Sequence, residues 1–348
     1  LPGDFVLNQK DNMNYLYVAT MSGILHIATY EQSDWSIKKS LQIFKKPIRK
    51  VLLSDDTIFV GSSTGRIYVL DCDGNVLRKP KTIRNSDGDP IEISSMCTIA
   101  DSSDGPDTFC LVVGDDLGNV YILKLSEGSD EWEIVETLEE QDDSITSVHF
   151  HPYRKTLLAS SGDGTLLVYD LKRSKIIAHS TSLDDEILSL TVDNDDNVIC
   201  STGSGALVSY KWGYWGKVSA RLKPSFHSSS SINSIRLVIH EAMPKLITGT
   251  VDGSLRSVDL QKRFVPPDFL HQFEDSIEKI SSFELLQPPL IAVSFSNDSN
   301  IEFFQTNPKE LEPGHESPID TRKKRQKKTN DTSASLKNQI GTFFSGLN

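Results

Sequence analysis

The chain has 348 residues, of which 37% are hydrophobic, and its formal net charge is −12. This composition supports a folded core, no apolar run approaches the roughly 18 residues of a membrane-spanning helix, and no signal-peptide pattern opens the chain. Four widely spaced cysteines form no Cys-x-x-Cys pair. We therefore expect reduced thiols and a soluble intracellular protein, with no membrane association.

One short turn between two alternating apolar runs recurs seven times. It contains Asn300 in the last repeat and a glycine in the other six, namely Gly23, Gly65, Gly118, Gly164, Gly205 and Gly253. Successive turns are 42, 53, 46, 41, 48 and 47 residues apart. A period of about 40–45 residues with four short strands per unit is typical of WD-type propellers. The sequence predicts an all-β fold, a seven-bladed WD-repeat β-propeller over residues 1–307.

The first repeat is expected to begin with its innermost strand, around Asp4–Leu7. The chain starts at Leu1 without a methionine, so we expect the natural N-terminus to lie upstream. In a propeller, residues before the first inner strand usually supply the outer strand of the last blade. Either such residues close the ring here, or it closes in another way.

The longest interval between turns contains two polar stretches, Arg84–Pro90 and Asp101–Asp107. Both are predicted to be surface loops, which on a rigid scaffold often carry recognition.

The best-formed repeat covers residues 147–173. Val148 and Phe150 alternate on an inner strand, Leu157–Ser160 forms the next strand, and Asp163-Gly164 supplies a tight hairpin turn. Tyr169-Asp170 stands where the Trp-Asp pair of WD repeats would be. No repeat has a Gly-His dipeptide, so we expect packing and turns to hold the blades together.

Several pairs of residues resemble fragments of active or metal sites. His149 and His151 form a His-x-His pair, but no third ligand lies nearby in sequence. The acid pairs at 115–116, 142–143, 184–185 and 195–196 fall at turns, where Asp is favoured for its local hydrogen bonds. No phosphate-binding loop, Gly-x-Ser-x-Gly or dinucleotide motif occurs. We predict a protein that is not an enzyme and has no cofactor or metal.

The segment Trp212-Gly213-Tyr214-Trp215-Gly216 places three aromatic residues on one turn. Exposed aromatics are good interface anchors, so Trp212, Tyr214 and Trp215 are candidate interface residues. The alternative, that they pack over the outer strand of their own blade, is equally open.

Residues 308–348 form an irregular, basic C-terminal tail. Pro- and Glu-containing sequence is followed by six cations within seven residues, Arg322, Lys323, Lys324, Arg325, Lys327 and Lys328. Such runs are typical of nuclear localisation signals and of RNA contacts. The tail ends in an apolar Phe-Phe-x-x-Leu motif, and we interpret Phe343, Phe344 and Leu347 as a partner anchor on a flexible tether.

Charge divides the chain between these two parts. Residues 308–348 carry a net charge of +3, and the remainder carries −15. A body this acidic repels a phosphate backbone and suits basic proteins, including ribosomal proteins. Any RNA contact is therefore expected at the basic tail.

These features together resemble the nucleolar WD-repeat protein 55 family and its fungal counterparts. The resemblance is closest over residues 157–304, including the aromatic-glycine segment, and the basic run with its terminal Phe-Phe-x-x-Leu motif strengthens it. It implies a nucleolar, non-catalytic scaffold in ribosome biogenesis, acting in rRNA processing and large-subunit assembly. It also implies docking on pre-ribosomal large-subunit proteins and rRNA contacts through the tail, as a monomeric propeller within a larger assembly.

A second hypothesis is a substrate receptor of a cullin–RING ubiquitin ligase. The segment Ser161–Lys172 is similar to the adaptor-binding box of such receptors, with Tyr169 in place of Trp. Capture of pre-ribosomal proteins or of a ligase adaptor would discriminate between the two.

Overall fold

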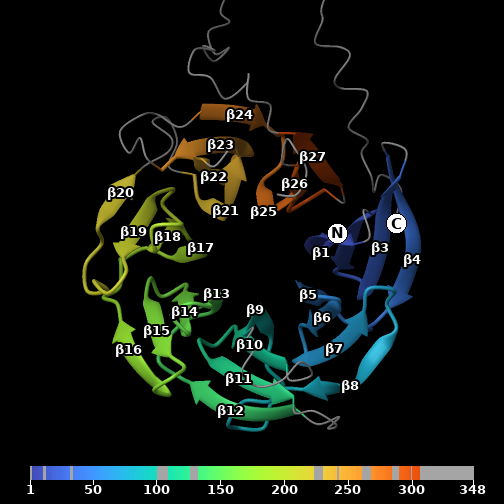
Figure 1. The fold of residues 1–348 in the computed structure, drawn as a ribbon, viewed down its shortest axis with the longest axis horizontal. Coiled ribbons are helices and arrows are strands. Elements are labelled where there is room, and N and C mark those ends of the chain that lie inside the picture. Colours follow the sequence, from blue (N-terminus) through green and yellow to red (C-terminus); the bar gives the residue numbers. More distant parts are fainter. Residues whose placement is uncertain are drawn as a thin grey trace, which may run out of the picture.

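The computed structural model describes residues 2–10, 13–31, 34–99, 109–125, 132–222, 230–240, 243–260, 268–283, 290–298 and 300–305. Over these residues the secondary structure consists of β-strands, without a helix. The strands form seven antiparallel sheets that stand in a ring around a central axis (Figure 1). The predicted seven-bladed β-propeller is confirmed.

The first three blades are four-stranded sheets. Blade one contains β1 (Pro2–Lys10), β2 (Met13–Thr20), β3 (Ile24–Glu31) and β4 (Asp34–Gln42). Blade two contains β5 (Ile48–Ser54), β6 (Thr57–Ser62), β7 (Arg66–Asp71) and β8 (Val76–Thr82). Blade three contains β9 (Ile93–Ile99), β10 (Phe109–Asp115), β11 (Val120–Leu125) and β12 (Trp132–Leu138).

Three further four-stranded blades follow, and then a sheet with three strands in the described part of the chain. Blade four contains β13 (Ile145–His151), β14 (Thr156–Ser161), β15 (Leu166–Asp170) and β16 (Lys175–His179). Blade five contains β17 (Ile187–Val192), β18 (Asn197–Thr202), β19 (Leu207–Lys211) and β20 (Ala220–Leu222). Blade six contains β21 (Ile232–His240), β22 (Met243–Thr250), β23 (Ser254–Asp259) and β24 (Asp268–Gln272). Blade seven contains β25 (Ile277–Phe283), β26 (Leu290–Phe295) and β27 (Ile301–Gln305).

Within each blade the strands pair in chain order, with the first strand innermost (Figure 1). The second strands β6 and β14 are buried along their whole length, whereas the outer strand β16 alternates between exposed and half-buried residues. A strand covered on both faces consists mainly of apolar and small residues, because neither face meets water. The continuous run of apolar and small residues in β14 therefore reflects coverage by the blades on both sides.

The core lies between the blades. Each of its clusters joins residues of neighbouring sheets, as where Val112 of blade three packs with Ile145 and Leu157 of blade four. Burial of such aliphatic side chains stabilises the fold by roughly 1.5–3 kcal/mol each before ordering costs. The blades therefore hold together by apolar packing, as expected for repeats without the Gly-His signature.

Blade seven closes the ring directly onto blade one. The rings of Trp35 on β4 and Phe303 on β27 stack with centroids 5.0 Å apart. Nearer the axis, the Lys279 ammonium on β25 pairs with the Asp4 carboxylate and also donates to the Phe5 carbonyl oxygen at 2.9 Å. The other Asp4 oxygen accepts a hydrogen bond from the Val51 amide of blade two at 2.9 Å. Asp4, on the predicted innermost strand, therefore links three blades.

The predicted boundary between propeller and tail follows the last described strand, which ends at Gln305. Residues 308–348, with the basic run and the Phe-Phe-x-x-Leu motif, lie outside the described residues, as does the predicted loop Asp101–Asp107. The other predicted loop, Arg84–Pro90, is a small hairpin closed by a bridge between its two end residues. Among the described residues no helix is long and apolar enough to cross a membrane.

Candidate interaction surfaces

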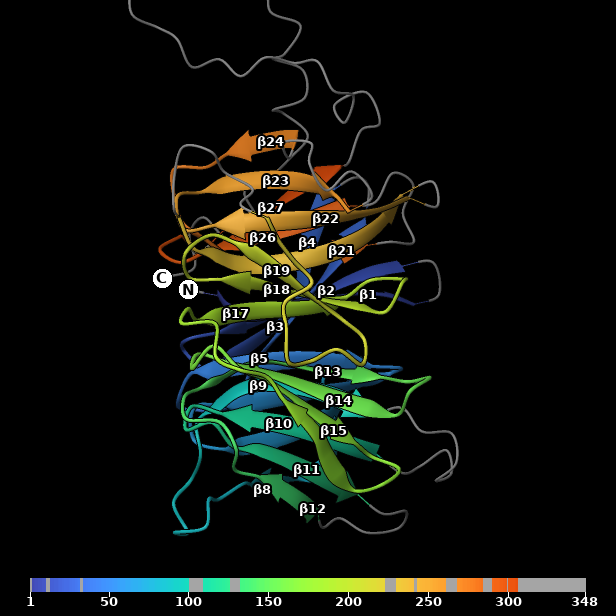
Figure 2. The ribbon, with the colours of Figure 1, turned by 90° about the vertical axis from the view of Figure 1, so that its left-hand side faces the viewer.

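Antiparallel blades place their loops alternately on two faces of the ring, and Figure 2 shows both from the side. We call one of them the glycine-turn face, because it carries the turns between second and third strands together with the links from each blade to the next. The opposite face carries the first-to-second and third-to-fourth strand loops. The two faces differ in chemistry at blades four and five.

The glycine-turn face is tightly closed around the predicted turn glycines. Gly164 has a φ of +82°, and a Cβ added to it would lie 2.6 Å from the Asp185 carbonyl oxygen. The Gly164 carbonyl oxygen accepts a hydrogen bond of 3.1 Å from the Leu183 amide, and Gly65 and Gly253 accept equivalent bonds from the links that follow their blades. Glycine is thus required twice over, by backbone conformation and by the close approach of the next link.

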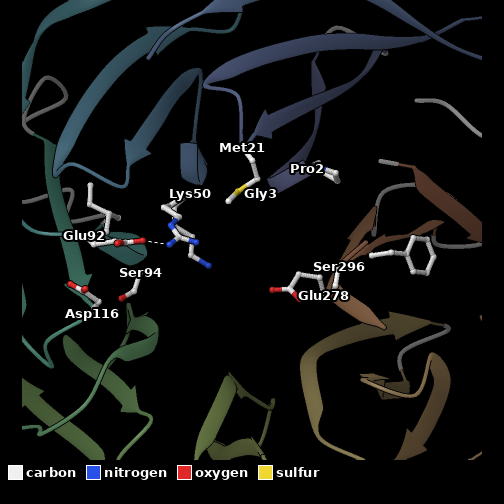
Figure 3. Close-up of a pocket in the computed structure, with 12 residues that line it drawn as sticks. Pro2, Gly3, Met21, Lys50, Glu92, Ser94, Asp116, Glu278 and Ser296 are labelled. Atoms are coloured by element: carbon white, nitrogen blue, oxygen red, sulfur yellow. Dashed lines mark hydrogen bonds and ion pairs between the residues drawn. The ribbon is translucent and has the colours of Figure 1, made fainter. Parts of the chain in front are cut away.

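A cavity of about 430 Å³ lies at the inner rim of this face (Figure 3). Its lining mixes charges, because Arg49 and Lys50 of β5 lie near Glu92, Asp116 and Glu278. Arg49 pairs with Glu92, and the Ser296 hydroxyl donates to the Glu278 carboxylate at 2.9 Å. With charges of both signs and a wide mouth, the cavity shows no preference for one class of small molecule.

An acidic rim extends along the glycine-turn face from the link before blade four to the link before blade seven. We define it by eleven carboxylates: Glu139, Glu140, Asp142, Asp143, Asp163, Asp184, Asp185, Glu186, Asp252, Glu274 and Asp275. The described segments that carry them, 139–144, 161–165, 180–186, 251–254 and 273–276, contain no Lys, Arg or His. The Arg221 guanidinium lies 3.4 Å from the Asp185 carboxylate, so the rim is a predominantly, though not uniformly, negative surface.

Some rim carboxylates also build the face. Asp163 accepts hydrogen bonds from Thr165 and from the Asp142 amide. Partial burial alone would raise its pKa, but these bonds outweigh burial and hold the pKa of Asp163 below its usual value. Asp185 accepts from the Ser204 amide and hydroxyl at 3.0 and 2.6 Å. In contrast, Glu139, Glu140 and Glu186 are exposed, which leaves them open to a partner.

Of the remaining acid pairs, Asp115 of 115–116 serves a turn, as its position indicated, whereas Asp196 of 195–196 accepts from His151 and Arg154 of the neighbouring blade. Asp115 and Asp193 each accept from the amides two and four residues later and from the amide group of an Asn, Asn119 and Asn197 respectively. Asp71 and Asn75 repeat this geometry. The Asp-x-x-x-Asn spacing is a turn signal that can be read in the sequence.

The His-x-His pair is divided between two environments. Burial lowers the pKa of His149 to about 4, so its imidazole is neutral at physiological pH. His151 Nε2 lies 2.9 Å from an Asp196 carboxylate oxygen on the opposite face. Within the described residues, His, Cys, Asp and Glu side chains form no group of three that could hold a metal ion.

The three aromatics of the 212–216 segment have different roles. Trp215 is buried in the core between blades four and five, and Trp212 packs against the same cluster. Tyr214 is 69% exposed. The tryptophans therefore pack, although into the core between two blades and not over the outer strand of their own blade, and Tyr214 is the exposed ring of the segment.

Residues that sequence reasoning missed surround this segment. Tyr153, in the first loop of blade four, is 91% exposed. Beside it, the Arg154 guanidinium lies 4.8 Å from the centre of the Trp212 ring and donates through Nε to Asp196 at 2.9 Å. We define the aromatic-basic surface as Tyr153, Arg154, Lys155, Lys172, Arg173, Lys175, Lys211, Trp212, Tyr214 and Lys217. Its signal in the sequence was the alternation of aromatic and basic residues in YRK and KWGYWGK.

Comparisons with known proteins agree with this architecture. The sequence profile of the family described as "WD domain, G-beta repeat" matches residues 132–170, which run from β12 to the end of β15. The chain is 25% identical to WD repeat-containing protein 55 of Arabidopsis thaliana over 273 residues, covering 77% of this chain and 72% of that protein. It is also 25% identical to the WD repeat-containing protein 55 homolog of Drosophila willistoni over 202 residues, covering 57% of this chain and 37% of that protein.

Among solved structures, the crystal structure of the Saccharomyces cerevisiae Sqt1 superposes with a TM-score of 0.65 at 14% identity, covering 87% of this chain and 82% of that one. At this identity the likeness shows the fold alone. The chain is therefore a WD-repeat β-propeller protein, a class that typically acts as a non-catalytic interaction scaffold.

Within that class, the chain is similar in sequence to WD repeat-containing protein 55 and its homologs. It spans 37% of the fly relative's length, so what the whole relatives do passes to this chain only as a proposal.

Proposed function

We propose that the protein is a non-catalytic scaffold of ribosome biogenesis, acting in rRNA processing and large-subunit assembly, and that it docks a basic pre-ribosomal protein on its acidic rim. The single observation that carries this proposal is the rim itself. Eleven carboxylates occupy described loop segments without Lys, Arg or His, and the Arg221 guanidinium on the adjoining strand pairs with one of them, Asp185. Such a surface attracts basic chains and speeds their association.

The rigidity of the glycine-turn face favours docking over chemistry. Its links are bonded to the preceding turns, and its turn glycines leave no space for a side chain. Because the backbone of this face is already ordered, binding has to order only the carboxylate side chains, which limits the entropic cost of docking. The exposed Glu139, Glu140 and Glu186 are the rim residues most able to pair with lysines or arginines of the partner.

The tail supplies the remaining parts of the proposal. Arg322–Lys328 is assigned to nuclear and nucleolar targeting or to RNA contact, and Phe343, Phe344 and Leu347 to a linear anchor on a pre-ribosomal partner. These assignments rest on composition and on the family resemblance.

Affinity capture from growing cells tests the docking proposal. Intact tagged protein is expected to retain large-subunit precursors, and a Glu139→Lys/Glu140→Lys/Glu186→Lys variant to lose them. A Lys45→Glu/Lys46→Glu variant, also on the glycine-turn face but in blade one's link, is the matched control and should retain them. Retention by the rim variant at wild-type levels would remove the rim from the proposal, and capture of a cullin–RING adaptor by intact protein would favour the ligase-receptor function.

Localisation tests the tail separately. We expect alanine replacement of the six cations in Arg322–Lys328 to abolish nucleolar concentration, and a Phe343→Ala/Phe344→Ala variant to concentrate normally but to co-sediment poorly with pre-ribosomes. Nucleolar accumulation of the first variant, or normal co-sedimentation of the second with unchanged Tm, would contradict the role assigned to that motif.

A further inference from the structure

We propose that the aromatic-basic surface on the opposite face of blades four and five binds single-stranded nucleic acid. In this proposal Tyr153 and Tyr214 stack on bases, and the lysines and arginines around them contact phosphates. The inference goes beyond the docking function, because it places a polynucleotide site on the propeller body, on the face away from the acidic rim. Sequence composition alone favoured the tail for such a contact.

The centre of the surface is pre-organised by a chain of contacts across three loops. Asp196 of blade five accepts from His151 Nε2 and from Arg154 Nε, both at 2.9 Å. The His151 ring lies 4.9 Å from the Trp212 ring, which in turn lies 5.1 Å from the buried Trp215. The loops that carry Tyr153 and Tyr214 are therefore anchored to the core, and binding needs little further ordering.

The two tyrosines themselves are not needed by the core. Their exposed fractions of 91% and 69% are the largest of any tyrosine among the exposed large side chains of the described residues. Aromatic rings held out from a rigid base are the stacking platforms of single-strand binding proteins, where each stacked base contributes roughly 1–3 kcal/mol. Stacking needs only a π-face, so it tolerates any sequence.

The local charge suits phosphates. Lys172, Lys211 and Lys217 are exposed, and none of them pairs with a carboxylate in the part of the chain that the structure describes. Two of the acids nearby are already engaged, although Asp195, in the same loop as Asp196, is exposed. Asp196 binds Arg154 and His151, and Asp170 accepts from the amides of its own turn.

The acidic rim does not cancel this local charge. The strands of blade four are five to seven residues long, and at about 3.3 Å per residue they separate the two faces by roughly 20 Å. The screening length at physiological ionic strength is about 8 Å. A phosphate on the aromatic-basic surface therefore responds mainly to the cations beside it.

Fluorescence anisotropy with a labelled 15-nucleotide oligouridylate tests the proposal on the full chain. The tail could bind the same probe, so the measurements use a background with the six cations of Arg322–Lys328 replaced by alanine. We expect this background to bind, Tyr153→Ala/Tyr214→Ala to weaken binding roughly tenfold or more, and Lys172→Glu/Lys211→Glu/Lys217→Glu to weaken it and to flatten its salt dependence.

Two controls separate the surface from its alternatives. Lys45→Glu/Lys46→Glu removes exposed lysines from the other face and should leave the affinity unchanged. Oligothymidylate measured in parallel decides between RNA and DNA as the source of the single strand. The proposal is overturned if the tail-neutralised background does not bind the oligonucleotide, or if the tyrosine variant binds it with the affinity of its parent. It is also overturned if the tyrosine variant loses an acidic protein partner while its affinity for the oligonucleotide is unchanged. Rim variants should bind the probe normally, so this inference and the docking proposal can fail independently.

Discussion

Blades four and five use the same eight strands to support two faces of opposite character. On the glycine-turn face the links run so close to the turns that a Cβ on Gly164 would meet the Asp185 carbonyl oxygen, and the loop side chains are acidic. On the opposite face Gly213 also has a positive φ, +84°, yet nothing lies within 4 Å of an added Cβ, and aromatic and basic side chains extend outward. The glycine-turn face thus presents charged side chains on a tightly packed backbone. The opposite face presents aromatic and basic side chains on loops with free space around them.

This difference teaches that a propeller fixes the ends of its strands and leaves the chemistry of each face to the loops. The tight face suits a partner recognised by charge, since its geometry is set by the backbone. The open face suits a ligand recognised by rings and by flexible cations. The two faces should therefore respond differently to the same kind of substitution.

The largest expected difference is between Gly164→Val and Gly213→Val. Both place a β-branched residue at positive φ, which is strained in any context. Only Gly164→Val also forces a side chain against backbone, so we expect a loss of about 3 kcal/mol, compared with about 1 kcal/mol for Gly213→Val. Urea unfolding measures both, and equal losses would show that the two faces are equally open.

A second prediction concerns the inner strand between the faces, where burial lowers the pKa of His149 from its usual 6.5 to about 4. The unfolded chain binds this proton first as the pH falls, so stability is full above about pH 6.5 and declines as the pH falls towards 4. Between pH 7 and pH 5 the loss is up to about 2 kcal/mol.

Burial also lowers the pKa of His26 and adds in the same direction. A His149→Gln variant should flatten most of the decline measured by urea unfolding at each pH. An unchanged pH dependence in that variant would show that groups on the two faces, and not this inner strand, govern the acid response.

The smallest expected effect tests the cluster under the aromatic-basic surface. Hydrogen bonds from Arg154 and His151 lower the pKa of Asp196. Because the pair is partly exposed, Asp196→Asn should cost only about 1 kcal/mol, whereas Asp195→Asn in the same turn should cost less than about 0.5 kcal/mol. Equal Tm values for the two variants would mean that Asp196 does not order the loops of the open face.

The sequence was sufficient for the ring and its seven turns because local chemistry decides them. Alternating apolar runs define strands, and a glycine at positive φ defines the turn in six of the seven blades, as at Gly23 and Gly205. The same repeat pattern also predicted that the strand around Asp4–Leu7 is the innermost strand of blade one. The structure adds that the matched repeat, residues 132–170, begins one strand before blade four. Sequence repeat and structural blade are therefore offset by one strand.

Which side chains are exposed on each face depends on contacts between blades, and no local sequence pattern predicts those contacts. Trp212, Tyr214 and Trp215 lie within four residues of one another, yet Trp215 is buried and Tyr214 is exposed, because the neighbouring blade covers one ring and not the other. The joining of Asp196 to Arg154, 42 residues earlier, likewise needs blades four and five side by side.

By itself, then, the sequence determined the fold class, the number of blades and the acidic body, since periodicity, turn chemistry and charge are local or additive properties. Only the tertiary structure decided how the ring closes through Asp4 and Lys279, which carboxylates gather into one rim, and which aromatics remain exposed. These depend on which loops the strands bring to the same face, and that arrangement exists only once the blades have packed.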